Sequence, residues 1–203
     1  EILIGSPLGL SGAFASFGAR QKAAIEMAQE DINAFLSKAG IPVKFTFLFE
    51  DTEQKADVSL AKVQSLAAKG VKVFVGFSSS SEIRGPSAYL DTNKLIAISG
   101  SSVAPRSTIG KRWDEGSYIF RVLPTCEYEG RALAKAFIDL GFKKAAIITT
   151  KDAYSEAIEK SFIKNFQELG GEVVKTISYE YGIKTFASEI SILEDALTKY
   201  SNK

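Results

Sequence analysis

The chain has 203 residues, 45% of them hydrophobic, so it can bury the core of one large domain or of two small ones. Its 25 basic and 24 acidic residues give a formal net charge of +1, which argues against nucleic acid or an anionic membrane as a partner. With Cys126 as its only cysteine and no histidine, it lacks the usual zinc and iron-sulfur ligand sets, so we expect no metal.

The absence of histidine also weakens the case for an enzyme. It removes the commonest general base and every Ser-His or Cys-His nucleophile pair, which leaves only less common chemistry based on carboxylates, lysine or tyrosine. The chain opens on Glu1-Ile2-Leu3 without the pattern of a signal peptide, and no apolar run is long enough to span a bilayer. We therefore expect a mature or trimmed chain with no enzymatic activity and no cofactor.

Short apolar runs alternate with amphipathic stretches along the chain. This order, β then α repeated, predicts an α/β protein whose parallel sheets carry helices on both faces. Most of the predicted strands are too apolar to face water. The seven are Ile2–Leu8, Val43–Glu50, Val71–Phe77, Leu95–Ser99, Tyr118–Val122, Ala145–Thr150 and Val173–Tyr179.

Five amphipathic stretches place apolar residues at helical spacing, with charged residues on the opposite face. We predict that all five apolar stripes belong to the core rather than to a cofactor site. The stripes are Ile25, Ala28, Ile32 and Phe35; Ala56, Leu60, Val63 and Ala67; Leu133, Ala136, Phe137 and Leu140; Ile158, Phe162, Phe166 and Leu169; and Phe186, Ile190, Leu193, Leu197 and Tyr200.

The alternation is interrupted once, between Gly100 and Thr125, where serine, proline and glycine surround one short strand. This composition is typical of a crossover between two lobes. We predict a first lobe over residues 1–122, a hinge crossover over 123–126 and a partial second lobe over 127–203. The second lobe has few strands, so we expect one edge of its sheet to be uncovered.

Function is expected in the loops that follow the strands, because open α/β sheets bind ligands at the carboxyl ends of their strands. The loop after the third strand is Gly76-Phe77-Ser78-Ser79-Ser80-Ser81-Glu82, which leads into a helix. A helix start offers unpaired N–H groups and partial positive charge to a carboxylate or a phosphate. For any single serine, a simple N-cap with Glu82 or a neighbour completing the turn is an equally good interpretation.

Other strand ends carry further candidates. The loop after the fourth strand, Ser99-Gly100-Ser101-Ser102-Val103, is again polar, and two convergent polar loops are a stronger signal than one. The loop after the first strand lacks both G-x-G-x-x-G and a GK[ST] phosphate loop, so nucleotide binding is not supported. Its Phe17 suits the apolar wall of a ligand site, although aromatic residues beside a turn are more often plain packing. Tyr154 follows the sixth strand. Its ring either lies at the mouth of the second lobe, where a ligand could reach it, or caps the following helix at the surface.

Several short segments stand in a characteristic order. They are Ile4-Gly5 to Leu10-Ser11-Gly12, Gly18 with an alanine-rich helix ending in Glu30-Asp31-Ile32-Asn33, Phe49-Glu50-Asp51-Thr52, the serine run after Gly76, Ile98-Ser99 to Ala104-Pro105, Phe120-Arg121 and Asp152-Ala153-Tyr154. In their order and spacing the whole chain resembles the type I periplasmic binding proteins, and among them the branched-chain amino-acid (leucine/isoleucine/valine) receptors of ABC transporters.

The resemblance implies two Rossmann-like lobes and a ligand whose α-carboxylate and α-ammonium are held by the loops after the third and fourth strands. An aromatic residue after the first strand and a tyrosine from the second lobe also contact ligand in that family. At position 103 the family usually has a hydroxyl residue, whereas this chain has a valine. Only the backbone amide of Val103 would therefore bind the ligand there. The matching positions are Ser79, Ser80, Ser101, Ser102, Val103, Phe17 and Tyr154.

The resemblance also implies a receptor outside the cytoplasm, in the periplasm or at the cell surface, that captures an amino acid or similar small carboxylate. By hinge closure it would deliver this ligand to an ABC permease in the membrane. A ligand-sensing domain of a receptor or regulator is the first alternative, and an α/β enzyme of another type is the second. Family members continue for well over a hundred further residues that complete both lobes. If the chain is part of such a receptor, we expect weak ligand binding and either a homodimer through open sheet edges or a loosely packed second lobe.

Overall fold

The structure, a computed structural model, describes residues 1–111, 113–180 and 182–201. It divides into two compact units, unit 1 from Glu1 to Pro124 and unit 2 from Thr125 onward. The boundary between them falls inside the crossover predicted over residues 123–126. The end of the predicted second lobe at Lys203 lies outside the described residues, as do the side chains of Leu197 and Tyr200 in the fifth predicted stripe.

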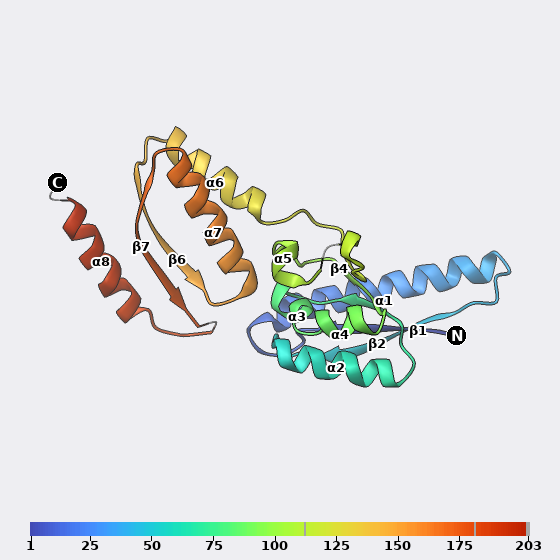
Figure 1. Cartoon of the computed structure of the whole chain (residues 1–203). Helices are drawn as coiled ribbons and strands as arrows, with labels where there is room; N and C mark the ends of the chain where they lie inside the picture. Colours follow the sequence, from blue (N-terminus) through green and yellow to red (C-terminus); the bar gives the residue numbers. More distant parts are fainter. Residues whose placement is uncertain (112, 181, 202–203) are drawn as a thin grey trace. The chain divides into compact units, whose positions relative to one another are not determined.

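Unit 1 is built on a parallel sheet of five strands in the order β2-β1-β3-β4-β5 (Figure 1). Each predicted strand of the first lobe is present, with ends that differ by up to two residues. The strand expected inside the crossover joins this sheet beside β4. The bounds are β1 (Ile2–Leu8), β2 (Phe45–Asp51), β3 (Val73–Gly76), β4 (Ile96–Ser99) and β5 (Ile119–Arg121).

Among its described residues, unit 1 has two long helices and three that span a single turn or little more. The helix that the serine loop was expected to lead into is present as α3, whereas the other two short helices were not predicted, because four to six residues are too few to show a helical stripe. The long helices are α1 (Ala15–Lys38) and α2 (Ala56–Ala68); the short ones are α3 (Ser80–Arg84), α4 (Ser87–Thr92) and α5 (Arg106–Ile109), with 3-10 turns at Gly12–Phe14 and Trp113–Glu115.

The core of unit 1 lies between α2 and the middle of the sheet. Val63 and Leu66 of α2 and Phe74 of β3 are fully buried. A Cβ atom at Gly5 would lie 2.6 Å from the Phe74 ring, so this ring fills the space that a side chain of β1 would take. Of the second predicted stripe, Val63 is fully buried and Ala56, Leu60 and Ala67 are half-buried, so its prediction as core is only partly confirmed.

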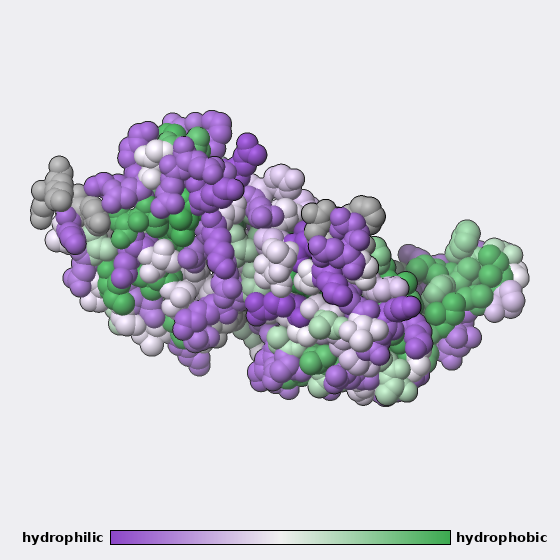
Figure 2. Space-filling view, in the orientation of Figure 1, coloured by the Kyte–Doolittle hydropathy of each residue, from purple (hydrophilic) through white to green (hydrophobic). Residues whose placement is uncertain are grey.

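The prediction for the stripe on α1 is wrong. Ile32 is 42% exposed and Phe35 is 68% exposed, and Figure 2 shows hydrophobic surface gathered at the far end of this helix. The reason is that α1 turns polar side chains toward the edge strand β2. Asn33 exchanges two hydrogen bonds of 2.8 Å with the backbone of Phe45, and the Phe47 amide donates to the Gln29 carboxamide (2.7 Å). The helix covers the free backbone of an edge strand instead of burying an apolar stripe.

Unit 2 contains a parallel pair of strands, β6 (Lys144–Thr150) and β7 (Glu172–Tyr179). Helix α6 (Glu127–Asp139) packs along α7 (Ala153–Glu168), and α7 contacts both strands. Helix α8 (Ala187–Ser201) lies against β7, on the side away from α7 (Figure 1). Within the described residues β6 and β7 pair only with each other, so each has one unpaired edge, as predicted for this lobe.

The core of unit 2 is small and aromatic. Phe162 stacks on Phe166 with ring centroids 5.1 Å apart, and the Phe137 ring meets both edge-on. Ala134 and Ala145 complete the buried cluster. The fourth predicted stripe, which contains Phe162 and Phe166, is confirmed as core, although Leu169 at its end is exposed.

The stripe predicted on α6 is core only at Phe137, because this helix otherwise buries small residues. Gly130 and Ala134 face α7, whereas Leu133 and Leu140 are 45% and 73% exposed. A Cβ atom at Gly130 would lie 2.7 Å from the Ser161 Cβ, so the two helices approach too closely for large side chains. In the stripe on α8, Phe186 and Ile190 are also exposed, which again contradicts the prediction of core.

Candidate functional site

The polar loops after β3 and β4 leave the sheet at the same edge, as predicted. Gly76 ends β3 and pairs with Ser99, which ends β4. Gly76 and Phe77 both have positive φ angles, 145° and 62°, and the Phe77 amide donates to the Pro7 carbonyl at 2.8 Å. The serine run therefore begins at a tightly fixed turn directly beyond the strands.

Ser80 joins the two loops. Its hydroxyl oxygen accepts hydrogen bonds from the amides of Val103 (3.2 Å) and Ala104 (3.1 Å) and from the Ser102 hydroxyl (3.2 Å). Both serines are buried, with Ser80 2% exposed. Ser80 and Ser102 thus fix the β4 loop from within, and the Val103 amide is engaged by Ser80.

Ser101 connects the β4 loop to α1. Its hydroxyl donates to the Phe77 carbonyl (2.7 Å) and accepts from Nε2 of Gln21 (3.1 Å). The other amide atom, Gln21 Oε1, is buried and has no hydrogen-bond partner among the residues that the structure describes. Ser101 itself is only half-buried, so this corner of the network presents hydroxyl and carboxamide groups near the surface.

Ser79 has the N-cap geometry that the sequence left as an alternative. Its backbone is extended (φ −143°, ψ 165°), and its hydroxyl oxygen accepts from the Glu82 amide at 3.3 Å. The helix that it caps is α3, which ends at Arg84 after five residues. Because so short a helix has a small dipole, anion binding here depends on hydroxyl and N–H groups rather than on the helix.

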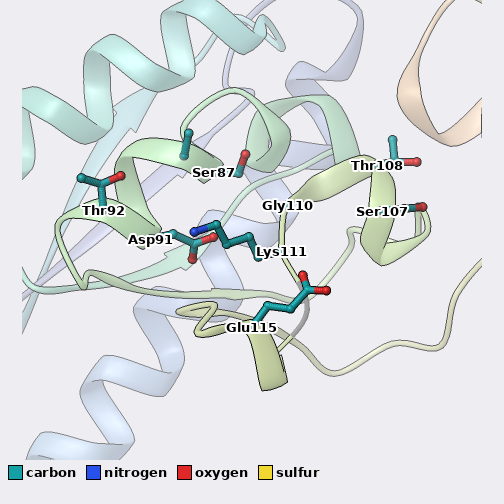
Figure 3. Close-up of a pocket in the computed structure, with 9 residues that line it drawn as sticks. Ser87, Asp91, Thr92, Ser107, Thr108, Gly110, Lys111 and Glu115 are labelled. Atoms are coloured by element: carbon teal, nitrogen blue, oxygen red, sulfur yellow. The ribbon is translucent and has the colours of Figure 1, made fainter.

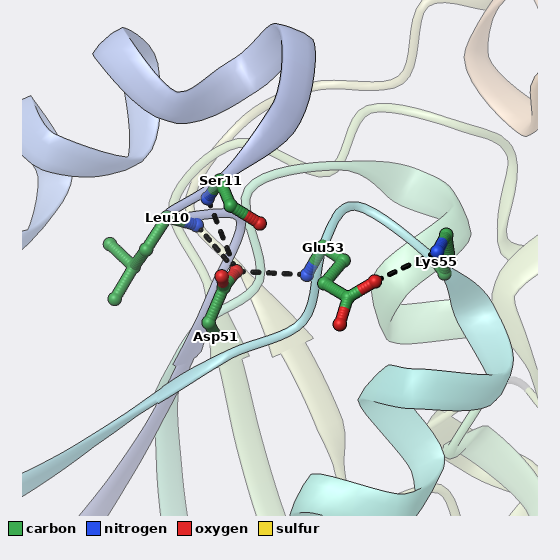
Figure 4. Close-up of polar contacts among 5 residues, drawn as sticks. All are labelled: Leu10, Ser11, Asp51, Glu53 and Lys55. Carbon is green, nitrogen blue, oxygen red and sulfur yellow. Dashed lines mark hydrogen bonds and ion pairs between the residues drawn. The ribbon is translucent and has the colours of Figure 1, made fainter.

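Asp51, at the end of β2, organises the neighbouring loop after β1 (Figure 4). Its Oδ1 accepts from the amides of Leu10 (2.9 Å), Ser11 (3.3 Å) and Glu53 (2.9 Å). Burial by itself raises the pKa of Asp51, but the hydrogen bonds from the Ser11 side chain and these amides outweigh it and hold the pKa below its usual value. A charged Asp51 therefore pins the β1 loop to the strand ends.

Phe17 lies in the first turn of α1 and is 36% exposed. Its ring meets Phe14 edge-on at 5.9 Å, and the Arg20 guanidinium lies 6.0 Å from its centroid. The next residue, Gly18, is buried so tightly that a Cβ atom would overlap the Gly9 carbonyl oxygen. Phe17 is thus held in place by the β1 loop, one helical turn before Gln21.

Tyr154 belongs to unit 2, at the start of α7. Asp152 caps this helix by accepting from the amides of Tyr154 (2.9 Å) and Ser155 (3.0 Å). The Tyr154 hydroxyl donates to Glu129 (3.1 Å) and the side chain is 36% exposed. Burial and the neighbouring Glu129 carboxylate raise the pKa of Tyr154, so the phenol stays protonated and serves as a donor.

Hydrogen bonds join four of the seven predicted residues, Ser80, Ser101, Ser102 and Val103, through Ser99 and the Phe77 carbonyl. Ser79 precedes Ser80 in the chain, and its hydroxyl accepts from the Glu82 amide. Phe17 is tied to this network through α1 and Gln21. The ligand-binding roles of all seven stay predictions. The sequence analysis assigned no role in the site to Gln21, Asp51 or Glu82. The segment Phe49-Glu50-Asp51-Thr52, which carries part of the family resemblance, was the one signal that pointed to the end of β2.

A separate pocket in unit 1 contains none of the predicted residues. It has a volume of about 460 Å³ and lies between α4, α5 and the turn that follows (Figure 3). Ser87, Asp91, Ser107 and Lys111 are among the residues that line it. Asp91 already accepts from the Ser117 hydroxyl and the Tyr118 amide, so this acid serves to anchor β5.

Comparison of the amino-acid sequence with models of protein families shows to which family the chain belongs. Residues 1–197 match the family model described as periplasmic binding protein. The chain belongs to the periplasmic binding protein family. Within the described part of the chain, no helix is both long enough and apolar enough to cross a membrane.

Two curated relatives illustrate how far the similarity extends. An uncharacterised protein of Methanocaldococcus jannaschii is 33% identical over 183 residues, which cover 90% of this chain and 44% of that protein. An amino acid binding protein of Pseudomonas aeruginosa is 30% identical over 182 residues, covering 89% of this chain and 46% of the relative. The chain therefore spans about half the length of the relatives that it matches.

Solved structures of this family share the fold. A leucine-binding protein of Thermotoga maritima superposes with a TM-score of 0.82 at 21% identity, over 97% of this chain and 54% of that one. A second structure is that of a solute-binding protein of an ABC transporter from Rhodopseudomonas palustris, in complex with 3,4-dihydroxybenzoic acid. It superposes with a TM-score of 0.76 at 23% identity, over 96% of this chain and 52% of that one. The fold expected from the sequence is therefore confirmed.

Proposed function

We propose that the chain is the ligand-binding part of an extracytoplasmic solute receptor that serves an ABC transporter. The observation that carries this proposal is the family match over residues 1–197. The polar network that joins the loops after β3 and β4, at the edge where α/β sheets bind ligands, supports it. The receptor performs no chemistry on its ligand, and its partner in the membrane is a permease.

The proposed ligand is a small carboxylate. Amino acids and 3,4-dihydroxybenzoic acid, which relatives or structural neighbours are named as binding, have a carboxylate in common. Ser79 and Ser101 are half-buried and offer hydroxyl groups near the surface. Ser80 and Ser102 are buried, and their hydrogen bonds hold the β4 loop in place. A hydrogen bond to a charged group contributes about 1.5–3 kcal/mol, so a few such donors suffice for selective capture of a carboxylate.

Thermal-shift and calorimetric measurements test this proposal. We expect leucine, valine or benzoate to raise the unfolding temperature, while leucinamide and benzamide, which lack the carboxylate, do not. Ser101→Ala should weaken binding by about 1–3 kcal/mol. Ser107→Ala, an exposed serine at the pocket beside α5, is the matched control and should bind like the parent. Equal responses to acids and amides, or unchanged affinity in Ser101→Ala, would contradict a carboxylate site.

We also propose that the isolated chain forms a homodimer through the open strand edges of unit 2. Within the described residues β6 pairs only with β7, so the N–H and C=O groups on its other edge are open to a strand of a second chain. Ile148 of β6 is 43% exposed and offers apolar surface to the same partner. Light scattering over a range of concentrations should show the dimer, and Ile148→Lys should favour the monomer. Leu140→Lys, on the exposed side of α6, is the control and should leave the dimer intact. A monomer at every concentration would overturn this proposal.

A further inference from the structure

Glu82 is a fully buried acid beneath the serine network. Its Oε1 accepts from the Thr52 hydroxyl, whereas its Oε2 is buried and has no hydrogen-bond partner in the described ranges. Its backbone is held as well, since the amide donates to Ser79 and the carbonyl accepts from the Ser59 hydroxyl at 2.7 Å. A side chain this enclosed costs less free energy as a neutral acid than as an unpaired charge.

The groups that interact with Glu82 among the described residues are neutral or acidic. The β2 end presents Thr52 and the Asp51 carboxylate, and α2 presents the Ser59 hydroxyl. On the β1 loop Gly9 lies close, since a Cβ atom there would be 3.4 Å from Glu82 Oε1. No ion pair found within the described parts of the chain includes Glu82. Burial raises the pKa of Glu82 and outweighs the opposing hydrogen bonds from Thr52 and Ser79, and the Asp51 charge raises it further.

Glu82 also connects the segments that hold the candidate site. Its carboxyl group accepts from Thr52 at the end of β2 and lies close to Gly9 after β1, and its amide donates to the Ser79 hydroxyl. The Gly9 amide is bound in turn by the Ser78 hydroxyl at 2.9 Å. Any charge that develops on Glu82 therefore acts close to Ser79, one of the serines that are proposed to receive a carboxylate.

We propose that Glu82 is a neutral, protonated positioning residue of the carboxylate site, and that loss of its proton disfavours an anionic ligand. This inference rests on the proposed function. In the neutral form Glu82 ties the loops after β1 and β2 to α3 without a charge. In the ionised form it places a second negative charge beneath the ligand carboxylate, in surroundings that screen it poorly.

Calorimetry of the full chain with benzoate and with leucine at pH 5.5, 7 and 8.5 tests this inference, since both ligands keep an ionised carboxylate throughout. The affinity of the parent should fall about tenfold or more across this range. Glu82→Gln, which is neutral at every pH, should keep the pH 5.5 affinity at pH 8.5. Glu30→Gln, an exposed acid on α1, is the control and should follow the parent. A flat profile for the parent, or the same slope in Glu82→Gln, would overturn the role of Glu82.

Thermal unfolding of the same proteins separates this result from a failure of the proposed function. If no carboxylate binds at any pH, the function is wrong, and stability then tests the protonation of Glu82 alone. A folded pKa above the unfolded one gives stability that is full below the unfolded pKa and is lost as the pH rises through the folded pKa. The unfolding temperature of the parent should therefore fall relative to Glu82→Gln as the pH rises. A difference that is constant with pH would show that Glu82 is not held neutral.

Discussion

The first strand of each unit shows how differently the two units bury the same kind of sequence. In unit 1, β1 lies between two neighbours and buries five successive residues, Ile4–Leu8. In unit 2, β6 has one neighbour and buries only Ala145 of its seven residues, although Ala145-Ala146-Ile147-Ile148 is apolar on both faces. An apolar strand predicts that a sheet exists, whereas burial on both faces requires further strands and helices around it.

The difference extends to the helices. In unit 1 α2 buries Val63 and Leu66 completely against a five-stranded sheet. In unit 2 the helices leave Leu133, Leu140 and Ile190 exposed around a core centred on Phe162 and Phe166. Unit 2 is therefore expected to be the less stable of the two, and its stability should depend on a few aromatic contacts.

The largest effect is expected from removing the centre of the smaller core. Phe166 is fully buried, and the backbone at Gly171 packs within contact of its ring. Phe166→Ala should cost about 3–5 kcal/mol. Hydrogen exchange should show unit 2 losing protection while unit 1 keeps it. Phe142→Ala, at a ring that is 53% exposed, is the control with a small effect. Equal loss of protection in both units would mean that they unfold together.

The second effect concerns the close packing that holds the candidate site in unit 1. Gly18→Ala introduces a Cβ atom into the Gly9 carbonyl oxygen, so α1 must shift away from the β1 loop. We expect a loss of about 2–3 kcal/mol in urea unfolding, at the upper end of the range for overpacking. Gly100→Ala is the matched control, because a Cβ there meets nothing within 4 Å. If both variants unfold at the same urea concentration, the contact between Gly18 and Gly9 does not fix this loop.

The third effect depends on pH and distinguishes the half-buried Asp51 from the fully buried Glu82. Asp51 has a lowered pKa, so its contribution is full above its unfolded pKa and is lost as the pH falls through the folded pKa. Asp51→Asn should therefore cost about 1–2 kcal/mol at pH 7 and almost nothing near pH 2. Urea unfolding at pH 7, 4 and 2 measures this difference. A cost that does not change with pH would show that the charge of Asp51 does not hold the β1 loop.

The sequence predicted the sheets well because strands depend on local pattern. The alternation of apolar runs placed every strand to within two residues, and the strand order brought the two serine loops to one edge. It failed where burial depends on the partner of an element. The stripe on α1 includes Phe35 and is apolar in the sequence. In the structure, however, α1 covers the edge strand β2 through hydrogen bonds of Asn33, and the stripe stays exposed.

The candidate site was predicted in its location but not in its internal order. A run of four serines does not reveal that Ser80 is buried and clamps the next loop, while Ser101 bonds to α1 through Gln21. Glu82 was assigned at most to completing a turn, because a single sequence gives no direct measure of how deeply an acid is buried. Its one local signal is its place between small or apolar neighbours, from Phe77 to Ile83.

The smallest effect is expected on the open face of β6, and it sharpens the comparison of the two first strands most directly. Ile148 is 43% exposed, whereas Ile4 of β1 is 6% exposed. At the lowest protein concentration that allows the measurement, Ile148→Thr should cost about 0.5 kcal/mol or less, and Ile4→Thr about 2 kcal/mol or more. If chains associate through unit 2, the cost of Ile148→Thr should grow with concentration, because burial in the dimer restores the hydrophobic contribution of the isoleucine. A cost near that of Ile4→Thr even in dilute solution would mean that this face of β6 is covered within the single chain, and the contrast between the two units would then be wrong.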